Sequence, residues 1–200
     1  MKKIAFILEG EENSGKTSTI KEIVKIICNN EKQIENIIIR EEDKHFYETP
    51  NEGTKINLED ILNKKDIGLI IQFNNGIKIG IESEGDPGRR NNKLFTSLRD
   101  FKEKKCDIIL CPIRYCEKGY CDYLYYEVKK ILNDEDKDIT ITLDPENKYE
   151  KPLFVDKNRY EMIWITNIYT KYKSKQAECN KESAELIYEL IEKAIKELSE

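Results

Sequence analysis

One stretch near the start of the chain, residues 10–17, constrains the possible folds more than any other. It reads Gly-Glu-Glu-Asn-Ser-Gly-Lys-Thr and fits the pattern of Gly, four variable positions, Gly, Lys, and then Ser or Thr. Its glycines let the backbone curl so that successive N–H groups point inward and form a concave site for anions. Lys16 can reach phosphate groups, and the Thr17 hydroxyl can bind Mg²⁺. The predicted phosphate-binding residues are Gly10, Asn13, Ser14, Gly15, Lys16, Thr17 and Ser18.

The residues that flank this loop form the setting that the motif needs. Residues 3–8 are a short apolar run of the length of a buried strand. After the loop, apolar residues recur at helical spacing, at Ile20, Ile23, Val24 and Ile27. A helix that opens at Gly15 would direct its N-terminal N–H groups and the positive end of its dipole toward the same phosphates. The alternative is a chance match in a turn, which at average composition arises in roughly one chain per hundred of this length.

Motif and setting together resemble the P-loop NTPase superfamily. The resemblance implies that superfamily's three-layer fold and the binding of a nucleotide, and it says less about the reaction. Residues 79–89 and 106–114 are also similar to small bacterial P-loop proteins of unassigned function. That second resemblance covers the middle of the chain but implies no substrate.

Predicted strands and helices alternate along the rest of the chain. Asn74-Asn75-Gly76 joins two β-rich runs, 68–73 and 77–81, and is a strong signal for a hairpin. Pro112 is expected to end its strand. Further strands are predicted over 35–40, 106–112, 138–143 and 162–167, and helices over 58–62, 93–104, 123–132 and 181–198. This order predicts a single α/β domain over residues 1–200, with a mainly parallel sheet, helices on both faces and an inserted β-hairpin.

An acidic turn, residues 82–90, follows the second strand of the predicted hairpin. In P-loop NTPases an acidic residue at the end of a central strand holds Mg²⁺ through water or orients an attacking water, so the resemblance implies such a residue here. The candidates are Glu82, Glu84 and Asp86. Glu82 directly follows the apolar run and is the preferred catalytic and metal-binding acid. Asp86 is the second choice, because two nearby glycines would let its loop bend toward the phosphates; the alternative is a solvated acidic turn.

The hairpin followed by Glu82-Ser83-Glu84-Gly85 is also similar to small GTPases, in which a hairpin leads into Asp-x-x-Gly. Glu replaces Asp in this chain. Those proteins recognise guanine with Asn-Lys-x-Asp after the next strand, where this chain has Cys111-Pro112-Ile113-Arg114. Guanine recognition by that device is therefore not supported, and ATP is favoured over GTP.

Arginine, cysteine and histidine supply the remaining candidates. A guanidinium can clamp phosphate oxygens and stabilise charge during phosphoryl transfer. The arginines expected near the phosphate edge are Arg89, Arg90, Arg99 and Arg114. Arg114, just past a strand end, is the predicted catalytic arginine, with ordinary surface charge as the alternative. Cys111, Cys116 and Cys121 lack the paired spacing of a zinc site and are predicted to be free thiols, and His45 is interpreted as a solvated loop residue.

Composition argues against several other classes of protein. Charged residues make up 36% of the chain and the formal net charge is -5, so the overall basic character typical of nucleic-acid-binding domains is lacking. The sequence has no apolar run of about eighteen residues, the length that a membrane span needs. Glu9 interrupts the first apolar run, so no export signal is expected, and the predicted setting is the cytoplasm with reduced cysteines.

The leading hypothesis is a Mg²⁺-dependent P-loop NTPase that binds ATP and cleaves or transfers its γ-phosphoryl group. A hydrolase or switch would control a protein partner through a nucleotide-dependent loop, for which residues 82–90 are the candidate. A nucleotide or small-molecule kinase would need an acceptor pocket and arginines, which residues 89–90 and 114–119 could supply. A non-catalytic module that senses nucleotide is the third hypothesis, because the motif predicts binding only. Membrane association and direct nucleic-acid binding are not expected.

Overall fold

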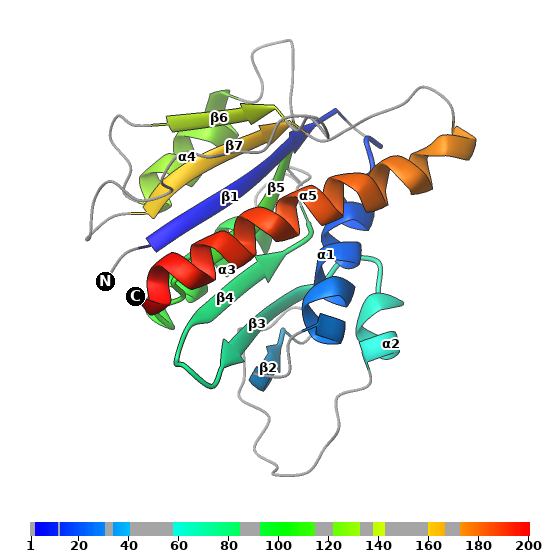
Figure 1. Cartoon of the computed structure of the whole chain (residues 1–200). Helices are drawn as coiled ribbons and strands as arrows, with labels where there is room; N and C mark the ends of the chain where they lie inside the picture. Colours follow the sequence, from blue (N-terminus) through cyan, green and yellow to red (C-terminus); the bar gives the residue numbers. More distant parts are fainter. Residues whose placement is uncertain are drawn as a thin grey trace.

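The computed structural model describes residues 3–11, 13–30, 34–40, 58–84, 93–114, 122–132, 138–142, 160–166 and 173–200. Within these ranges seven strands form one sheet in the order β2-β3-β4-β5-β1-β7-β6 (Figure 1). The strands are β1 (Lys3–Gly10), β2 (Ile34–Ile39), β3 (Gly68–Phe73), β4 (Lys78–Glu82), β5 (Ile108–Arg114), β6 (Asp138–Thr142) and β7 (Tyr160–Thr166). The helices are α1 (Lys16–Asn30), α2 (Leu58–Leu62), α3 (Lys93–Glu103), α4 (Asp122–Leu132) and α5 (Lys173–Ser199).

The sheet is mixed and mostly parallel. Strands β4, β5, β1, β7 and β6 pair in parallel, whereas β3 runs antiparallel to both of its neighbours, β2 and β4. The turn between β3 and β4 is the predicted hairpin, and Gly76 adopts φ 85° there, a conformation that glycine enters without a steric penalty. These observations confirm the α/β class, the mainly parallel sheet and the inserted hairpin.

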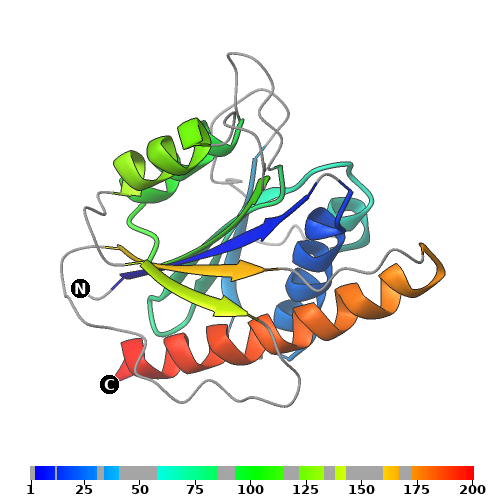
Figure 2. The ribbon, with the colours of Figure 1, turned by 90° about the horizontal axis from the view of Figure 1, so that it is seen from above.

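Two layers of helices cover the sheet, as Figure 2 shows from above. Helices α1 and α5 pack on one face and helices α3 and α4 on the other. Alternation along β1 supplies both faces: Ile4, Phe6 and Leu8 belong to the first core cluster, and Ala5 and Ile7 to the second. The buried apolar side chains of both layers remove a large apolar area from water, which is the main force that stabilises such a sandwich.

The helix predictions hold for the apolar part of each helix. Ile20, Ile23 and Ile27 of α1 are fully buried, as their spacing predicted. Helix α5 buries Ala184, Ile187, Ile191 and Ala194, but it begins at Lys173 rather than at the predicted residue 181. In the part of the chain that the structure describes, no helix combines the length and the apolar character that a membrane crossing requires.

The prediction that Pro112 ends its strand is wrong, because β5 continues to Arg114. Pro112 pairs with Leu8 of β1 on one side of the strand. On the other side, β4 pairs with β5 only as far as Leu110, so this end of β5 is an edge. Proline, which has no N–H to donate, is tolerated at such an edge.

Candidate functional site

The loop between β1 and α1 is shaped by two residues with left-handed backbone. Asn13 has φ 61° and Gly15 has φ 85°. Asparagine tolerates this conformation better than most residues, and glycine adopts it freely. Gly15 has a second reason to be glycine, since a Cβ atom there would collide with the side chains of Gln176 and Asn180 in α5. A Cβ atom at Gly10 would overlap Ser14 Oγ, so a side chain at either glycine of the motif would displace a neighbouring side chain.

Lys16 and Thr17 open helix α1 beside this loop. The Lys16 ammonium donates hydrogen bonds to the carbonyl oxygens of Gly10 (2.8 Å) and Glu11 (2.6 Å) and to Ser14 Oγ (3.3 Å). The Thr17 hydroxyl donates to the carbonyl oxygen of Ser83 at the end of β4 (3.0 Å). The first residues of α1 thus bring a cation, a hydroxyl and a helix N-terminus to one place.

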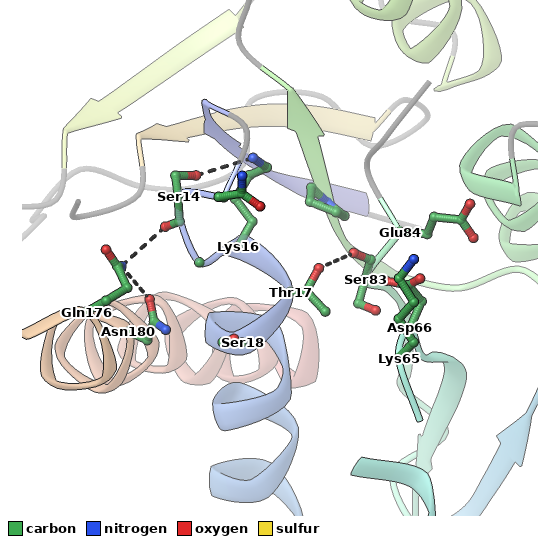
Figure 3. Close-up of a pocket in the computed structure, with 13 residues that line it drawn as sticks. Ser14, Lys16, Thr17, Ser18, Lys65, Asp66, Ser83, Glu84, Gln176 and Asn180 are labelled. Carbon is green, nitrogen blue, oxygen red and sulfur yellow. Dashed lines mark hydrogen bonds between the residues drawn. The ribbon is translucent and has the colours of Figure 1, made fainter. Parts of the chain in front are cut away.

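A cavity of about 470 Å³ lies against this loop (Figure 3). Its walls come from the loop and α1, from the segment that precedes β3, from the end of β4, from β5 and from the start of α5. The lining residues are Asn13, Ser14, Gly15, Lys16, Thr17, Ser18, Lys65, Asp66, Ser83, Glu84, Pro112, Gln176 and Asn180. A volume of this size suits a small-molecule ligand. Six of the seven predicted phosphate-binding residues line it, and the seventh, Gly10, accepts the hydrogen bond from Lys16.

Among the described residues, the acidic residues that line the cavity are Asp66 and Glu84. The Glu84 carboxylate is directed away from Thr17 (Figure 3) and lies 3.7 Å from the Lys93 ammonium of α3. Asp66 has no counterpart among the residues singled out from the sequence. Because β3 is antiparallel, its start lies at the edge of the sheet where the neighbouring parallel strands end. Ser83 fixes this arrangement, since its N–H donates to Ile67 O (2.9 Å) and its Oγ accepts from Ile67 N (2.7 Å). The Asn-Gly signal for a hairpin could have predicted this placement of Asp66, because the first strand of a hairpin runs antiparallel to the second.

The structure does not bring Glu82, the preferred catalytic and metal-binding acid, to the cavity. Its side chain is fully buried and is not among the residues that line the cavity. Alternation along β4 is the reason: Ile79 and Ile81 face α1 and α5, so Glu82 points to the opposite face, the side of α3. The backbone of the next residue, Ser83, is what reaches Thr17.

On the α3 side, Glu82 is held by Arg40 and Ser97. The Arg40 guanidinium spans both carboxylate oxygens, with Nη1–Oε2 2.6 Å and Nη2–Oε1 3.3 Å, and its side chain is only 9% exposed. The Ser97 hydroxyl accepts a hydrogen bond from Arg40 and donates one to Glu82 Oε2, and each bond is 2.5 Å long. Gly68 of β3 lies between the two charged residues, and a Cβ atom there would sit 3.1 Å from the guanidinium. Glycine at this position leaves room for Arg40 to reach across β3.

This buried ion pair also shapes the wall of the cavity. Glu82 Oε1 accepts hydrogen bonds from the backbone N–H groups of Ser83 (3.0 Å) and Glu84 (2.9 Å), both of which line the cavity. Burial raises the pKa of the Glu82 carboxyl, and Arg40, Ser97 and the N–H of Glu84 act against that rise. We infer that Glu82 positions Ser83 and Glu84 rather than contacting a ligand.

The structure does not bring all predicted site residues to the cavity. Arg114 ends β5 opposite Gly10 in the β1 ladder, yet it is not among the residues that line the cavity. Arg99 is exposed on α3, on the other face of the sheet. Cys111 is buried in β5, where burial raises its pKa, as expected for an inert thiol. The predictions for His45, Asp86, Arg89, Arg90, Cys116 and Cys121 lie outside the described residues.

Comparisons of the chain with protein-family models, curated proteins and solved structures find no match.

Proposed function

We propose that this chain is a P-loop NTPase that binds a nucleoside triphosphate with Mg²⁺ and cleaves or transfers its γ-phosphoryl group. The observation that carries the proposal is the association of the 10–17 loop with the cavity. The ammonium of Lys16, the hydroxyl of Thr17 and the N-terminus of α1 all meet there, beside two carboxylates. Cations, hydroxyls and oriented N–H groups at a helix N-terminus are what phosphate recognition uses.

The donor atoms at the cavity suit Mg²⁺, which prefers oxygen ligands. They are the Thr17 hydroxyl, the Ser83 carbonyl and the Asp66 carboxylate, and the Glu84 carboxylate would have to turn toward the cavity to join them. Glu84 Oε2 is buried without a hydrogen-bond partner and lies 3.7 Å from the Lys93 ammonium, both among the described residues. No three His, Cys, Asp or Glu side chains of the described ranges form a metal-binding group, so phosphate and water oxygens would complete the coordination. Once bound, Mg²⁺ would neutralise phosphate charge.

The residues of the chain would act by positioning and by electrostatics, which account for most catalysis of phosphoryl transfer. Lys16 can exchange the carbonyls of Gly10 and Glu11 for phosphate oxygens, because both sets accept from the same ammonium. Asp66 and Glu84 are the candidates for orienting an attacking water or hydroxyl, since they are the acidic residues among the described ones that line the cavity. Asp86 and Arg114 remain proposals for the same step.

The proposal also covers the base, the acceptor and the cellular setting. ATP is preferred to GTP because the chain lacks the guanine-reading sequence named above. The acceptor is water for a hydrolase, or a nucleotide or small molecule for a kinase, and a sensing module would bind without turnover. The proposed setting is the cytoplasm, where thiols stay reduced, and the four cysteines at described positions are free.

Two measurements test the proposal in sequence. Calorimetry with ATP·Mg²⁺ should detect binding by the purified protein. A protein that binds neither ATP·Mg²⁺ nor GTP·Mg²⁺ overturns the proposal. ³¹P NMR of the same mixture, with and without a pool of metabolites and nucleotides, then identifies the reaction. Free phosphate alone indicates a hydrolase, and a new phosphoester indicates a kinase. Binding with an unchanged spectrum favours the sensing module.

A further inference from the structure

The first two turns of α5 have a composition different from the rest of the helix. Residues 173–180 read Lys-Ser-Lys-Gln-Ala-Glu-Cys-Asn and carry no apolar stripe, and Ala177 and Glu178 are exposed. Two amide side chains, Gln176 and Asn180, point from this part of the helix toward the 10–17 loop (Figure 3). They are four residues apart, so both lie on one face of the helix.

Asn180 is the more buried of the two, with 6% of its surface exposed. Its Oδ1 accepts from Gln176 Nε2 (2.8 Å) and from Thr19 Oγ1 (3.5 Å). Gln176 Nε2 also donates to the Ser14 carbonyl (3.3 Å), so α5 and the loop are directly joined. The amide nitrogen of Asn180 has no hydrogen-bond acceptor among the described residues, although the residue lines the cavity.

The amide nitrogen of Asn180 is not among the buried atoms that lack a partner, so it is open to solvent, where water or a ligand can accept a hydrogen bond from it. The position of Asn180 indicates which part of a ligand would accept this hydrogen bond. Thr17, Ser83, Glu84 and Asp66 lie on one side of α1, and Gln176 and Asn180 lie on the other (Figure 3). If Lys16 and Thr17 take the terminal phosphates and the metal, the α5 wall is left for the rest of the nucleotide.

We propose that Asn180 is a specificity-determining residue whose amide donates a hydrogen bond to the nucleoside half of the ligand, its sugar or base. The inference rests on the proposed function and deepens it, because it divides the cavity into a phosphate end and a nucleoside end. Gln176 holds the Asn180 amide in orientation by occupying its oxygen, which leaves the nitrogen for the ligand.

The test compares two probes, ATP·Mg²⁺ and inorganic tripolyphosphate·Mg²⁺, by calorimetry on the full chain. Asn180→Ala removes the donor. Asn180→Asp also removes it but retains the oxygen that Gln176 and Thr19 use, so it serves if the alanine variant folds poorly. The readout is the affinity for ATP·Mg²⁺ divided by the affinity for tripolyphosphate·Mg²⁺. Any added charge repulsion toward the phosphates affects both affinities and largely cancels in this ratio. Glu178→Ala, on the exposed face of the same helix, is the matched control.

The ratio should fall about fivefold to tenfold in the Asn180 variants, the scale of one hydrogen bond, and stay unchanged in Glu178→Ala. A ratio unchanged in the Asn180 variants overturns the inference alone and reduces Asn180 to a brace for the loop. A wild-type protein that binds both probes equally well also overturns it. A wild-type protein that binds neither probe overturns the proposed function, and the inference with it.

Discussion

Lys16 is the residue on which the proposed function most depends. Its ammonium is bound by two carbonyls and a hydroxyl of its own loop, which are acceptors that phosphate oxygens can replace. We expect Lys16→Ala to retain the fold and to weaken ATP·Mg²⁺ binding by about 10²-fold, the scale of losing charge-assisted hydrogen bonds. Calorimetry measures the loss, and circular dichroism checks the fold. Unchanged ATP affinity in a folded Lys16→Ala protein would contradict the assignment of the loop.

Thr17 allows a sharper test of the metal, because only its hydroxyl is at issue. The hydroxyl donates to Ser83 in the structure and is the predicted ligand for Mg²⁺. Thr17→Ala should weaken ATP binding in the presence of Mg²⁺ and leave the much weaker binding without Mg²⁺ unchanged. Thr17→Ser retains the hydroxyl and is the control that should behave like the wild type. Equal losses with and without Mg²⁺ would assign Thr17 to packing rather than to the metal.

The residues of the loop could be predicted from the sequence because the motif is local and each position has a chemical requirement. Glu82 could not be placed in the same way. The sequence puts it at the end of a strand, and β4 does end there. Which face a strand-end residue takes depends on the register of the strand, and an error of one residue exchanges the faces. Glu84, two positions on, lines the cavity in its place.

At the level of elements, the Arg40–Glu82 pair joins β2 to β4 across β3. Arg40→Met removes the guanidinium and leaves a buried carboxyl, which should lower the free energy of unfolding by about 3 kcal/mol near neutral pH. Without Arg40, burial is less opposed and the pKa of Glu82 in the folded protein rises further. Such a group contributes stability below its unfolded pKa and loses it as the pH rises through the folded pKa. Arg40→Met should therefore destabilise more at about pH 8 than at about pH 5.

Urea unfolding of the wild type and the variant at both pH values measures this difference. The double variant, Arg40→Met with Glu82→Gln, removes the buried charge and should recover part of the stability and lose the pH dependence of the effect. Arg99→Met, an exposed arginine on α3, is the matched control and should change little at either pH. A constant loss at both pH values would show that Arg40 acts by packing and not through the Glu82 charge.

The elements also differ in how far sequence could define them. The apolar residues of α5 predicted its C-terminal part, but the first two turns, which carry Gln176 and Asn180, have no apolar pattern from which a helix could be predicted. Those turns face a polar loop, so their inward residues are amides that bond to it. The same holds for Asp66, whose place at the cavity follows from the antiparallel direction of β3 and not from its neighbours in sequence.

For the whole molecule, alternation of strands and helices predicted the class of fold but not the order of strands. β5 lies between β1 and β4, so the loop after β1 and the end of β4 are separated by a strand. Parallel strands that are buried on both faces have nearly uniform apolar sequences, and such sequences give little information on which strands lie next to each other in the sheet. The order matters because it spreads the walls of the cavity over segments far apart in the chain.

That spread leads to a prediction for the molecule as a whole. A ligand held only by the 10–17 loop would protect that loop alone from hydrogen exchange, whereas a ligand that fills the cavity contacts four regions. At short labelling times, before core amides exchange, ATP·Mg²⁺ should slow exchange in residues 13–19, 65–67, 83–84 and 174–180, all at or beside the cavity. The exposed hairpin turn at 74–76, at the opposite end of β4, should be unaffected. Mass-spectrometric exchange with and without ATP·Mg²⁺ measures this, and Lys16→Ala should remove all four effects together. Protection limited to residues 13–19 would mean that the walls from β3, β4 and α5 do not contact the ligand.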